Sequence, residues 1–273
     1  MTGPTYQDKV VIITGGSRGI GKGCALVFLR AAARVVICCN NEAEGLNAVQ
    51  DLKTLAGPNT PGTLTFLPCD VRETEDIQNL IDSTVNTHDR IDCLINNAGW
   101  HPPHKPIDEF SIDEFRDLIN LNLISVFTAC KFALPHLRKT KGNIINISSL
   151  VGSIGQLHAT TYVATKGAIT AFTKALAIDE AAHGVRVNSV SPGNVFTPLW
   201  QQAMAGAADP DRFLAEGEAA QLMGRMGSVE EVGRLCLFIA AEATFTTGVD
   251  HVISGGAELG YGPKSRNGHS PTA

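Results

Sequence analysis

The sequence predicts a single α/β domain built on a doubly wound, seven-stranded parallel sheet with helices on both faces. β-rich apolar runs alternate with longer segments of helical period along the 273 residues, which indicates β/α units joined by right-handed crossovers. The apolar runs are nearly continuous, as expected for strands that are buried on both faces. A glycine-rich turn directly follows the first run, where a strand passes into a helix.

Seven segments have the character of buried strands. They are KVVIIT (9–14), RVVICC (34–39), TLTFLP (63–68), IDCLIN (91–96), GNIINI (142–147), VRVNSV (185–190) and DHVIS (250–254). Segments of helical period lie between them, and they include 20–33, 74–88, 111–139 and 160–182. Gly and Pro clusters predict a surface turn at 56–62 and a rigid loop at 100–106. We expect one domain over 1–262 and a flexible C-terminal tail over 263–273.

Composition and charge favour a small-molecule ligand. The chain is 44% hydrophobic and 18% charged, with a net charge of −5 and no cluster of Lys or Arg. Nucleic acids and anionic membranes attract basic surfaces, so neither is an expected partner. No apolar run reaches the roughly 20 residues of a membrane span, and the N-terminus lacks the features of a signal peptide. We therefore expect a soluble protein of the cytosol.

The cysteines and histidines give no sign of a metal site. The seven cysteines show no CxxC spacing and lie mostly in apolar segments, so we interpret them as reduced and buried. His101 and His104 form an HxxH pattern, but the two prolines between them prevent the geometry of helical ligands. No metal is predicted.

The stretch TGGSRGIG (14–21) follows the first predicted strand. Gly15, Gly19 and Gly21 permit a tight turn and a close backbone approach, and the next helix directs its N-terminal N–H groups toward an anion. A plain strand-to-helix turn also uses glycine. The position of the motif at this junction favours the pyrophosphate of a dinucleotide in a Rossmann-type fold.

Further motifs follow in order: CDV (69–71), NNAG (96–99), LNLIS (121–125), NISS (146–149), YVATK (162–166) and SPGNVFTP (191–198). Together with the glycine-rich turn, they resemble the short-chain dehydrogenase/reductase family from about residue 8 to about residue 262. The resemblance implies an NAD(P)-dependent oxidoreductase that interconverts a secondary alcohol and a ketone. A non-catalytic nucleotide-binding scaffold of the same fold is the alternative.

Tyr162 and Lys166 are four residues apart, which places them on one helical face at about 5 to 6 Å between Cβ atoms. Alcohol oxidation by hydride transfer needs a base for the hydroxyl proton, and a free tyrosine is mostly protonated at neutral pH. A neighbouring ammonium, together with the positive nicotinamide of an oxidised cofactor, favours the phenolate. The resemblance gives Lys166 a second role in binding the nicotinamide ribose. The alternative is that Tyr162 packs in a helix interface while Lys166 is solvated.

Ser149 and Asn122 complete the predicted catalytic tetrad. Ser149 lies at the end of a predicted strand, where its hydroxyl can donate to the substrate oxygen, and Ser148 is the alternative. Asn122 is a poor helix former within a predicted helix. The resemblance makes it a positioner of Lys166 through an ordered water, and satisfying a local backbone group is the alternative.

The resemblance also implies a set of cofactor contacts along the carboxyl ends of the strands. These are Gly15, Ser17, Arg18, Gly19, Ile20, Gly21, Cys39, Asn40, Asp70, Val71, Asn97, Ala98, Gly99, Tyr162, Lys166, Pro192, Gly193, Val195 and Thr197. Asp70 is alternatively an N-cap, and Pro192 with Gly193 only a turn. Cys39 replaces the acidic residue that usually binds the adenosine ribose of NAD. NAD is favoured, and NADP remains open because Arg18 can pair with a 2'-phosphate.

Substrate contacts are predicted in loops beyond the strand ends, at His101, Ser149, Gln156, Leu199 and Trp200. For Trp200, packing in a lid or in the core is the alternative. An apolar wall of Trp and Leu suits a rigid alcohol. The chain contains the stretches VVICC, AGWHPPHKP, ALPHLRK, NISSLVGSIGQ, PGNVFTPLW, GRMG and GGAELGYG. In these stretches it most resembles 17β-hydroxysteroid dehydrogenases. A steroid 17β-hydroxyl is therefore the expected substrate. The alternative is L-fucose, whose hydroxyls suit His101 and Gln156. By the resemblance, the segment 255–262, which contains Tyr261, is expected to lie at a subunit interface of a homotetramer.

Overall fold

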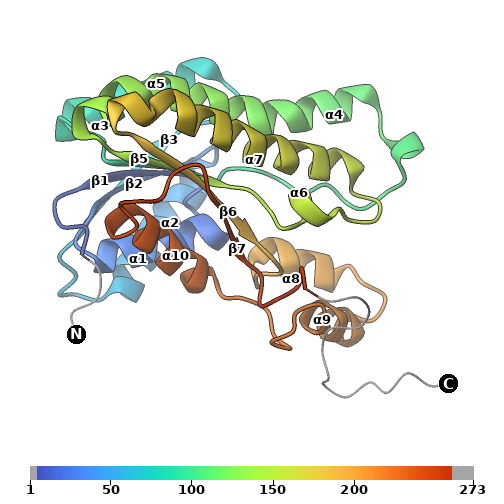
Figure 1. Cartoon of the computed structure of the whole chain (residues 1–273). Coiled ribbons are helices and arrows are strands. Elements are labelled where there is room, and N and C mark those ends of the chain that lie inside the picture. The colour runs from blue at the N-terminus through green and yellow to red at the C-terminus, as the bar shows by residue number, and fades with distance from the viewer. Residues whose placement is uncertain (1–4, 260–273) are drawn as a thin grey trace.

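A computed structural model describes residues 5–259 of the chain. Within that range, seven parallel strands form one sheet in the order β3-β2-β1-β4-β5-β6-β7 (Figure 1). The strands are β1 (Val10–Thr14), β2 (Arg34–Cys39), β3 (Thr63–Pro68), β4 (Cys93–Asn96), β5 (Asn143–Ile147), β6 (Arg186–Pro192) and β7 (Asp250–Ile253). The predicted doubly wound sheet is confirmed, and each strand lies where the apolar runs predict it.

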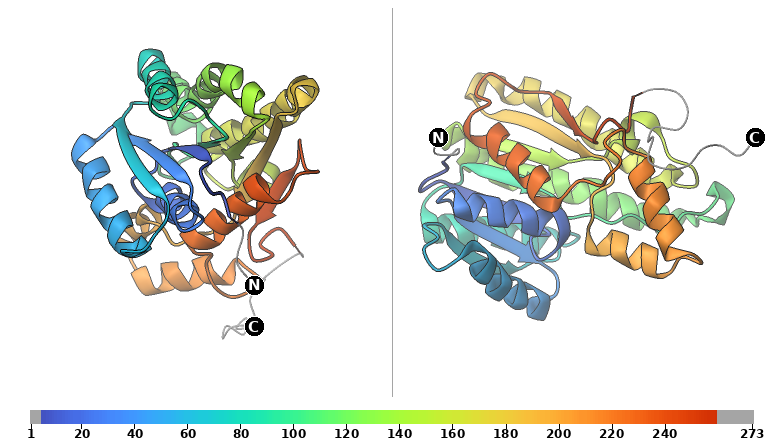
Figure 2. Two further views of the ribbon diagram at one scale, coloured as in Figure 1. Left: turned by 90° about the vertical axis from the view of Figure 1, so that its left-hand side faces the viewer. Right: turned by 90° about the horizontal axis from the view of Figure 1, so that it is seen from below.

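Helices cover both faces of the sheet (Figures 1 and 2). One face carries α3 (Thr74–His88), α4 (Ile112–Ile119), α5 (Ser125–Thr140) and α7 (Thr160–Glu180), and the other carries α1 (Gly19–Arg30), α2 (Glu42–Ala56) and α10 (Val229–Ala241). Three shorter helices follow the carboxyl ends of β5 and β6: α6 (Val151–Ile154), α8 (Pro198–Ala205) and α9 (Pro210–Ala219). Single turns of 3-10 helix occur at η1 (Ile107–Glu109) and η3 (Ala181–His183).

The central strands are buried on both faces, which explains their continuous apolar sequence. Successive strand residues point to opposite sides of the sheet. Ile13 of β1 therefore joins the apolar cluster that contains Phe28 of α1. Its neighbour Ile12 joins the cluster on the other face, which contains Ile81 of α3. Each face of the sheet thus supports its own core.

The strand order reverses at β1, which pairs with β2 on one side and with β4 on the other. The chain leaves Thr14 of β1 and Asn96 of β4 at the same edge of the sheet. Open α/β sheets bind their ligands beyond the carboxyl ends of the strands at such a switch point. The glycine-rich turn and the NNAG motif therefore meet at the expected ligand site.

The long helix predicted over 111–139 differs in detail from the structure. α4 and α5 are joined by one π-helical segment, η2 (Asn120–Ile124). A π segment adds a residue to a helical turn and is frequent at functional sites. Because the hydrophobic period continues on both sides, the sequence pattern does not reveal this change.

The stretch Ile112–Thr140 is also long and apolar enough, by length and composition, to cross a membrane. The sequence reading did not anticipate this, because polar residues interrupt the stretch while its mean hydropathy stays high. Half of its most apolar window is buried within the fold, as in the core helix of an α/β domain.

All seven cysteines lie within the described residues and are free. Six are buried, as predicted, whereas Cys39 at the end of β2 is only half-buried. The predictions for Tyr261 and for the tail 263–273 lie outside residues 5–259.

Candidate active site

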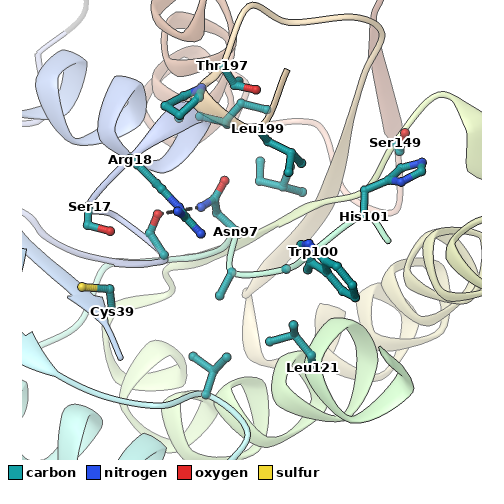
Figure 3. Close-up of a pocket in the computed structure, with 18 of the residues that line it drawn as sticks. Ser17, Arg18, Cys39, Asn97, Trp100, His101, Leu121, Ser149, Thr197 and Leu199 are labelled. Atoms are coloured by element: carbon teal, nitrogen blue, oxygen red, sulfur yellow. Dashed lines mark hydrogen bonds between the residues drawn. The ribbon is translucent and has the colours of Figure 1, made fainter. Parts of the chain in front are cut away.

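A cleft of about 460 Å³ lies at the carboxyl ends of the strands (Figure 3). Most of the predicted site residues line it. These are Gly15, Ser17, Arg18, Gly19, Ile20, Cys39, Asn40, Asp70, Val71, Asn97, Ala98, Gly99, His101, Ser149, Tyr162, Lys166, Pro192, Gly193, Thr197 and Leu199. Ser17, Arg18 and Cys39 lie on one side of the cleft, and His101 and Ser149 lie on the other. The predicted cofactor and substrate ends are thus separate.

The glycine-rich turn is shaped for close approach of a ligand. Gly15 has a φ of +63°, which glycine adopts without strain. A Cβ on Gly21 would lie 2.2 Å from the backbone oxygen of Gly15, so Gly21 supports the turn from behind and does not line the cleft. Arg18 is the N-cap of α1 and makes no side-chain bond to its first turn. The N–H groups there fit the pyrophosphate of a dinucleotide.

Asn97 joins the carboxyl ends of β1 and β4. Its backbone N–H and that of Ala98 each donate to Oγ1 of Thr14 at 3.0 Å. Its side-chain Nδ2 donates to the backbone oxygens of Thr14 and Gly15 at 2.9 and 3.0 Å. These bonds fix the floor of the cleft between the two strands.

Tyr162 and Lys166 lie one turn apart on α7, as predicted. Nζ of Lys166 is 5.7 Å from the centroid of the Tyr162 ring and donates to the backbone oxygen of Ile147 at 2.8 Å. Burial lowers the pKa of Lys166 to about 8, because the charged ammonium loses its hydration. The phenol and the ammonium therefore share the base of the cleft.

Burial also raises the pKa of Tyr162 to about 12, although a hydrogen bond with Ser149 lowers it. We predicted that Lys166 and the positive nicotinamide of an oxidised cofactor would together favour the phenolate. With the groups of the protein alone, the loss of hydration at the phenol dominates and raises its pKa. A further positive charge is needed to bring Tyr162 toward a neutral pKa.

The two neighbouring serines have different roles in the structure. Ser148 is buried, and its Oγ donates to the backbone oxygen of Lys166 at 2.9 Å and lies 3.1 Å from Oγ1 of Thr170. Ser149 instead contacts the phenol of Tyr162. Of the two alternatives from the sequence, Ser149 is the one placed to meet a substrate oxygen.

Asn122 lies in η2 and holds the loop that follows β4. Its Nδ2 donates to the backbone oxygen of Trp100 at 3.0 Å, and its Oδ1 accepts from the backbone N–H of Trp100 at 2.9 Å. Nδ2 also reaches Oγ1 of Thr165 at 3.2 Å. The side chain is 1% exposed. These contacts match the alternative in which Asn122 satisfies backbone groups, and its role toward Lys166 stays a prediction.

Replacing Asn122 by alanine is expected to lower the free energy of unfolding by about 1 to 3 kcal/mol, because it leaves two partly buried backbone groups of Trp100 without their partners. Urea unfolding measures the change. Asn120→Ala is the matched control, since Asn120 is half-buried in the same segment. Equal losses in the two variants would contradict the role assigned to Asn122.

His101 forms the wall of the cleft next to Tyr162, with the two ring centroids 4.1 Å apart. Its Nδ1 lies 2.6 Å from the backbone oxygen of Pro102, and its Nε2 lies 3.0 Å from Oε1 of Gln156. Gln156 does not line the cleft itself and reaches it through His101. Both ring nitrogens of His101 therefore have partners within the protein, and a ligand hydroxyl that bonds to His101 would replace one of them.

Two further predicted residues lie outside the cleft lining. Trp200 packs its ring against Phe213 of α9, with centroids 4.6 Å apart, and fills the space beside Gly217. The prediction of Trp200 as a substrate wall is therefore not supported, because the ring closes the α8–α9 contact. Val195 is buried and bridges to Gly227. Trp200 and Val195 thus pack next to the site without lining the cleft.

The structure adds residues that the sequence reading missed. Trp100 and Leu121 line the cleft toward the predicted substrate end (Figure 3). Glu44 and Arg72 also line the cleft, where they contact Ser17 and Asp70, respectively. Trp100 directly follows the NNAG motif, so its position was a usable signal. Leu121 begins the LNLIS motif and Arg72 directly follows CDV, so these positions also carried a signal, whereas Glu44 lies in none of the motifs. Cys69, Ile147, Ser148 and Pro198 complete the lining.

Asp70 is fixed by Arg72. Nε of Arg72 lies 3.0 and 3.2 Å from the two carboxylate oxygens, and this guanidinium lowers the pKa of Asp70. The helix that follows takes Glu73 as its N-cap, so Asp70 is not a cap. No group of three or more His, Cys, Asp or Glu among residues 5–259 is arranged to hold a metal.

Comparisons with known proteins agree with this geometry. A family model described as enoyl-(acyl carrier protein) reductase matches residues 15–258. L-fucose dehydrogenase of Bos taurus is 52% identical over 96% of this chain and 94% of its own. L-fucose dehydrogenase of Mus musculus is 51% identical over 98% and 96%. The solved structure of aldohexose dehydrogenase from Thermoplasma acidophilum is 30% identical over 92% and 94%, with a TM-score of 0.81.

Proposed function

The chain belongs to the short-chain dehydrogenase/reductase family and is an NAD(P)-dependent oxidoreductase, and we propose that it oxidises L-fucose or a closely similar sugar with NAD. The observation that carries the proposal is the identity of about half of all residues, over nearly the whole chain, with proteins named L-fucose dehydrogenase. The polar pair His101 and Gln156 beside Tyr162 supports it, because a sugar presents several hydroxyls to the cleft wall.

The steroid reading favoured by the sequence has less support. The relatives named above act, by their names, on sugars. Trp200 packs on Phe213 and therefore does not form part of the predicted apolar wall. Trp100 and Leu199 remain as apolar surfaces of the cleft. A hydroxysteroid is therefore the second candidate, to be tested beside the sugar.

In the proposed reaction, Ser149 donates a hydrogen bond to the substrate hydroxyl oxygen and holds it next to the phenol of Tyr162. The Tyr162 phenolate takes the proton from the hydroxyl oxygen while a hydride leaves the carbon that bears this hydroxyl. Bound NAD supplies the acceptor for that hydride. Lys166 keeps its buried ammonium near the phenol and favours the phenolate during proton transfer.

Two further expectations stay predictions. They are a homotetramer, which the resemblance implies, and a location in the cytosol, which the composition of the chain favours. The non-catalytic scaffold is the alternative class, and it has no need for Ser149 beside Tyr162 with Lys166 one turn away.

Substrate choice is tested by initial rates of NAD reduction with L-fucose and with estradiol. We expect turnover of L-fucose and none of estradiol. His101→Leu is expected to raise KM for L-fucose by about tenfold, because it removes one hydrogen bond to a sugar hydroxyl. His104→Leu is the matched control, since its ring lies 5.0 Å from His101 and outside the cleft lining.

Estradiol turnover without L-fucose turnover would replace the sugar proposal by the steroid one. An unchanged KM in His101→Leu would remove His101 from the substrate site. Dinucleotide binding without turnover of any alcohol would favour the scaffold.

A further inference from the structure

We infer that Glu44 selects NAD over NADP in this cleft and replaces the acidic residue that β2 lacks. The inference rests on the proposed NAD-dependent function and deepens it. In many dinucleotide-binding folds, a carboxylate about 20 residues after the glycine-rich turn accepts from the adenosine ribose. Here β2 ends in Cys39, and a neutral thiol does not repel a 2'-phosphate.

The Glu44 carboxylate lies at the side of the cleft where that repulsion is needed. Its Oε1 accepts from Oγ of Ser17, in the glycine-rich turn, at 2.6 Å. Nε of Arg18 is 3.8 Å from the same oxygen. Ser17, Arg18 and Cys39 lie together on one side of the cleft (Figure 3). Through its contacts with Ser17 and Arg18, Glu44 places its carboxylate in the cleft lining on this side.

The capping pattern of α2 shows that Glu44 is turned toward the cleft. Asn41 caps this helix, and its side chain accepts from the backbone N–H of Glu44 at 3.0 Å. In α4 and α10 the glutamate at the same helical position folds back onto the N-cap backbone, as in a capping box. The Glu44 side chain instead reaches Ser17, which leaves its charge at the ligand site.

The arginines at this end are already paired. Arg72 binds the carboxylate of Asp70 through two oxygens, and Arg18 lies near Glu44. These are the two arginines among the described residues that line the cleft. A 2'-phosphate would therefore compete with the carboxylates of Glu44 and Asp70 for these two guanidinium groups, whereas a ribose hydroxyl can donate to Glu44.

Binding of ADP-ribose and of 2'-phospho-ADP-ribose tests the inference by calorimetry and needs no turnover. We expect the unmodified protein to bind ADP-ribose more tightly. Glu44→Gln is expected to reduce this preference by about tenfold or more, chiefly through tighter binding of the phosphorylated ligand, because a like-charge contact is removed. Higher salt should reduce the preference of the unmodified protein, since the effect is electrostatic.

Glu42→Gln is the matched control. It removes the same charge from the same turn of α2, but Glu42 is exposed and lies outside the cleft lining. We expect its preference to equal that of the unmodified protein. The double variant Arg18→Gln/Glu44→Gln distinguishes loss of repulsion from release of Arg18. We expect part of the reduction to remain, so that its preference for ADP-ribose stays below that of the unmodified protein.

An unchanged preference in Glu44→Gln, or an equal change in Glu42→Gln, would overturn the inference while leaving the proposed sugar oxidation intact. Tighter binding of 2'-phospho-ADP-ribose by the unmodified protein would also overturn it. A preference for ADP-ribose that Glu44→Gln reduces, in a protein that does not oxidise L-fucose, would support the inference while contradicting the proposed substrate.

Discussion

Tyr162→Phe is expected to lower kcat for L-fucose oxidation by about 10²- to 10⁴-fold, because the variant loses the group that takes the substrate proton. The ring remains, so its 4.1 Å contact with His101 is kept. Dinucleotide affinity should stay within a few fold. Steady-state rates and calorimetric titration with NAD measure the two effects.

Tyr6→Phe is the control for a lost phenol elsewhere. Tyr6 is buried against Phe28, far from the cleft lining, and its hydroxyl accepts from Asn143. Its removal should affect stability more than kcat. Turnover close to that of the unmodified protein in Tyr162→Phe would exclude Tyr162 as the base.

Lys166→Met is expected to lower kcat/KM for L-fucose by about tenfold to a thousandfold near neutral pH, because a nearby opposite charge shifts a pKa by about 1 to 3 units. The shift is read from rates across a pH series. Methionine keeps the length of the buried stem and removes a charge whose burial is unfavourable. We therefore expect the variant to fold.

The pH dependence follows from the signs of the two pKa shifts. Burial lowers the pKa of Lys166 to about 8, so its charge is present below that pH and is lost above it. Burial raises the pKa of Tyr162, so its phenolate increases toward alkaline pH. The oxidation rate should therefore rise with pH, and the deficit of Lys166→Met should narrow above about pH 8.

Lys174→Met is the matched control for Lys166→Met, since Lys174 is exposed on the same helix. We expect no change in kcat/KM. A deficit in Lys166→Met that stays constant across the pH series would argue that Lys166 acts only through packing or cofactor binding.

The strands and the positions of the candidate catalytic residues follow from the sequence because their signals are local. Buried parallel strands have continuous apolar runs, and the spacing of Tyr162 and Lys166 places both on one turn of α7. The glycine-rich turn lies directly after β1. In each case, neighbouring residues carry the information.

The parts that were missed depend on contacts between distant segments. The π-helical η2 lies in an otherwise continuous helical pattern. Trp200 was expected in the cleft, but it packs on Phe213, which belongs to a separate helix. Glu44 reaches the cleft because its side chain accepts a hydrogen bond from Ser17 and does not fold back onto the N-terminus of α2. Neither the hydrophobic period nor a motif in the sequence predicts these contacts or the π-helical segment.

The central claim is that this cleft transfers a hydride from a sugar to NAD. The most direct measurement incubates the protein with NAD and L-fucose that is deuterated at all carbon positions, and then analyses the reduced nicotinamide by mass spectrometry. The account predicts deuterium in the reduced nicotinamide of the unmodified protein and almost none formed by Tyr162→Phe. Bound NAD that remains oxidised in the presence of L-fucose would contradict it.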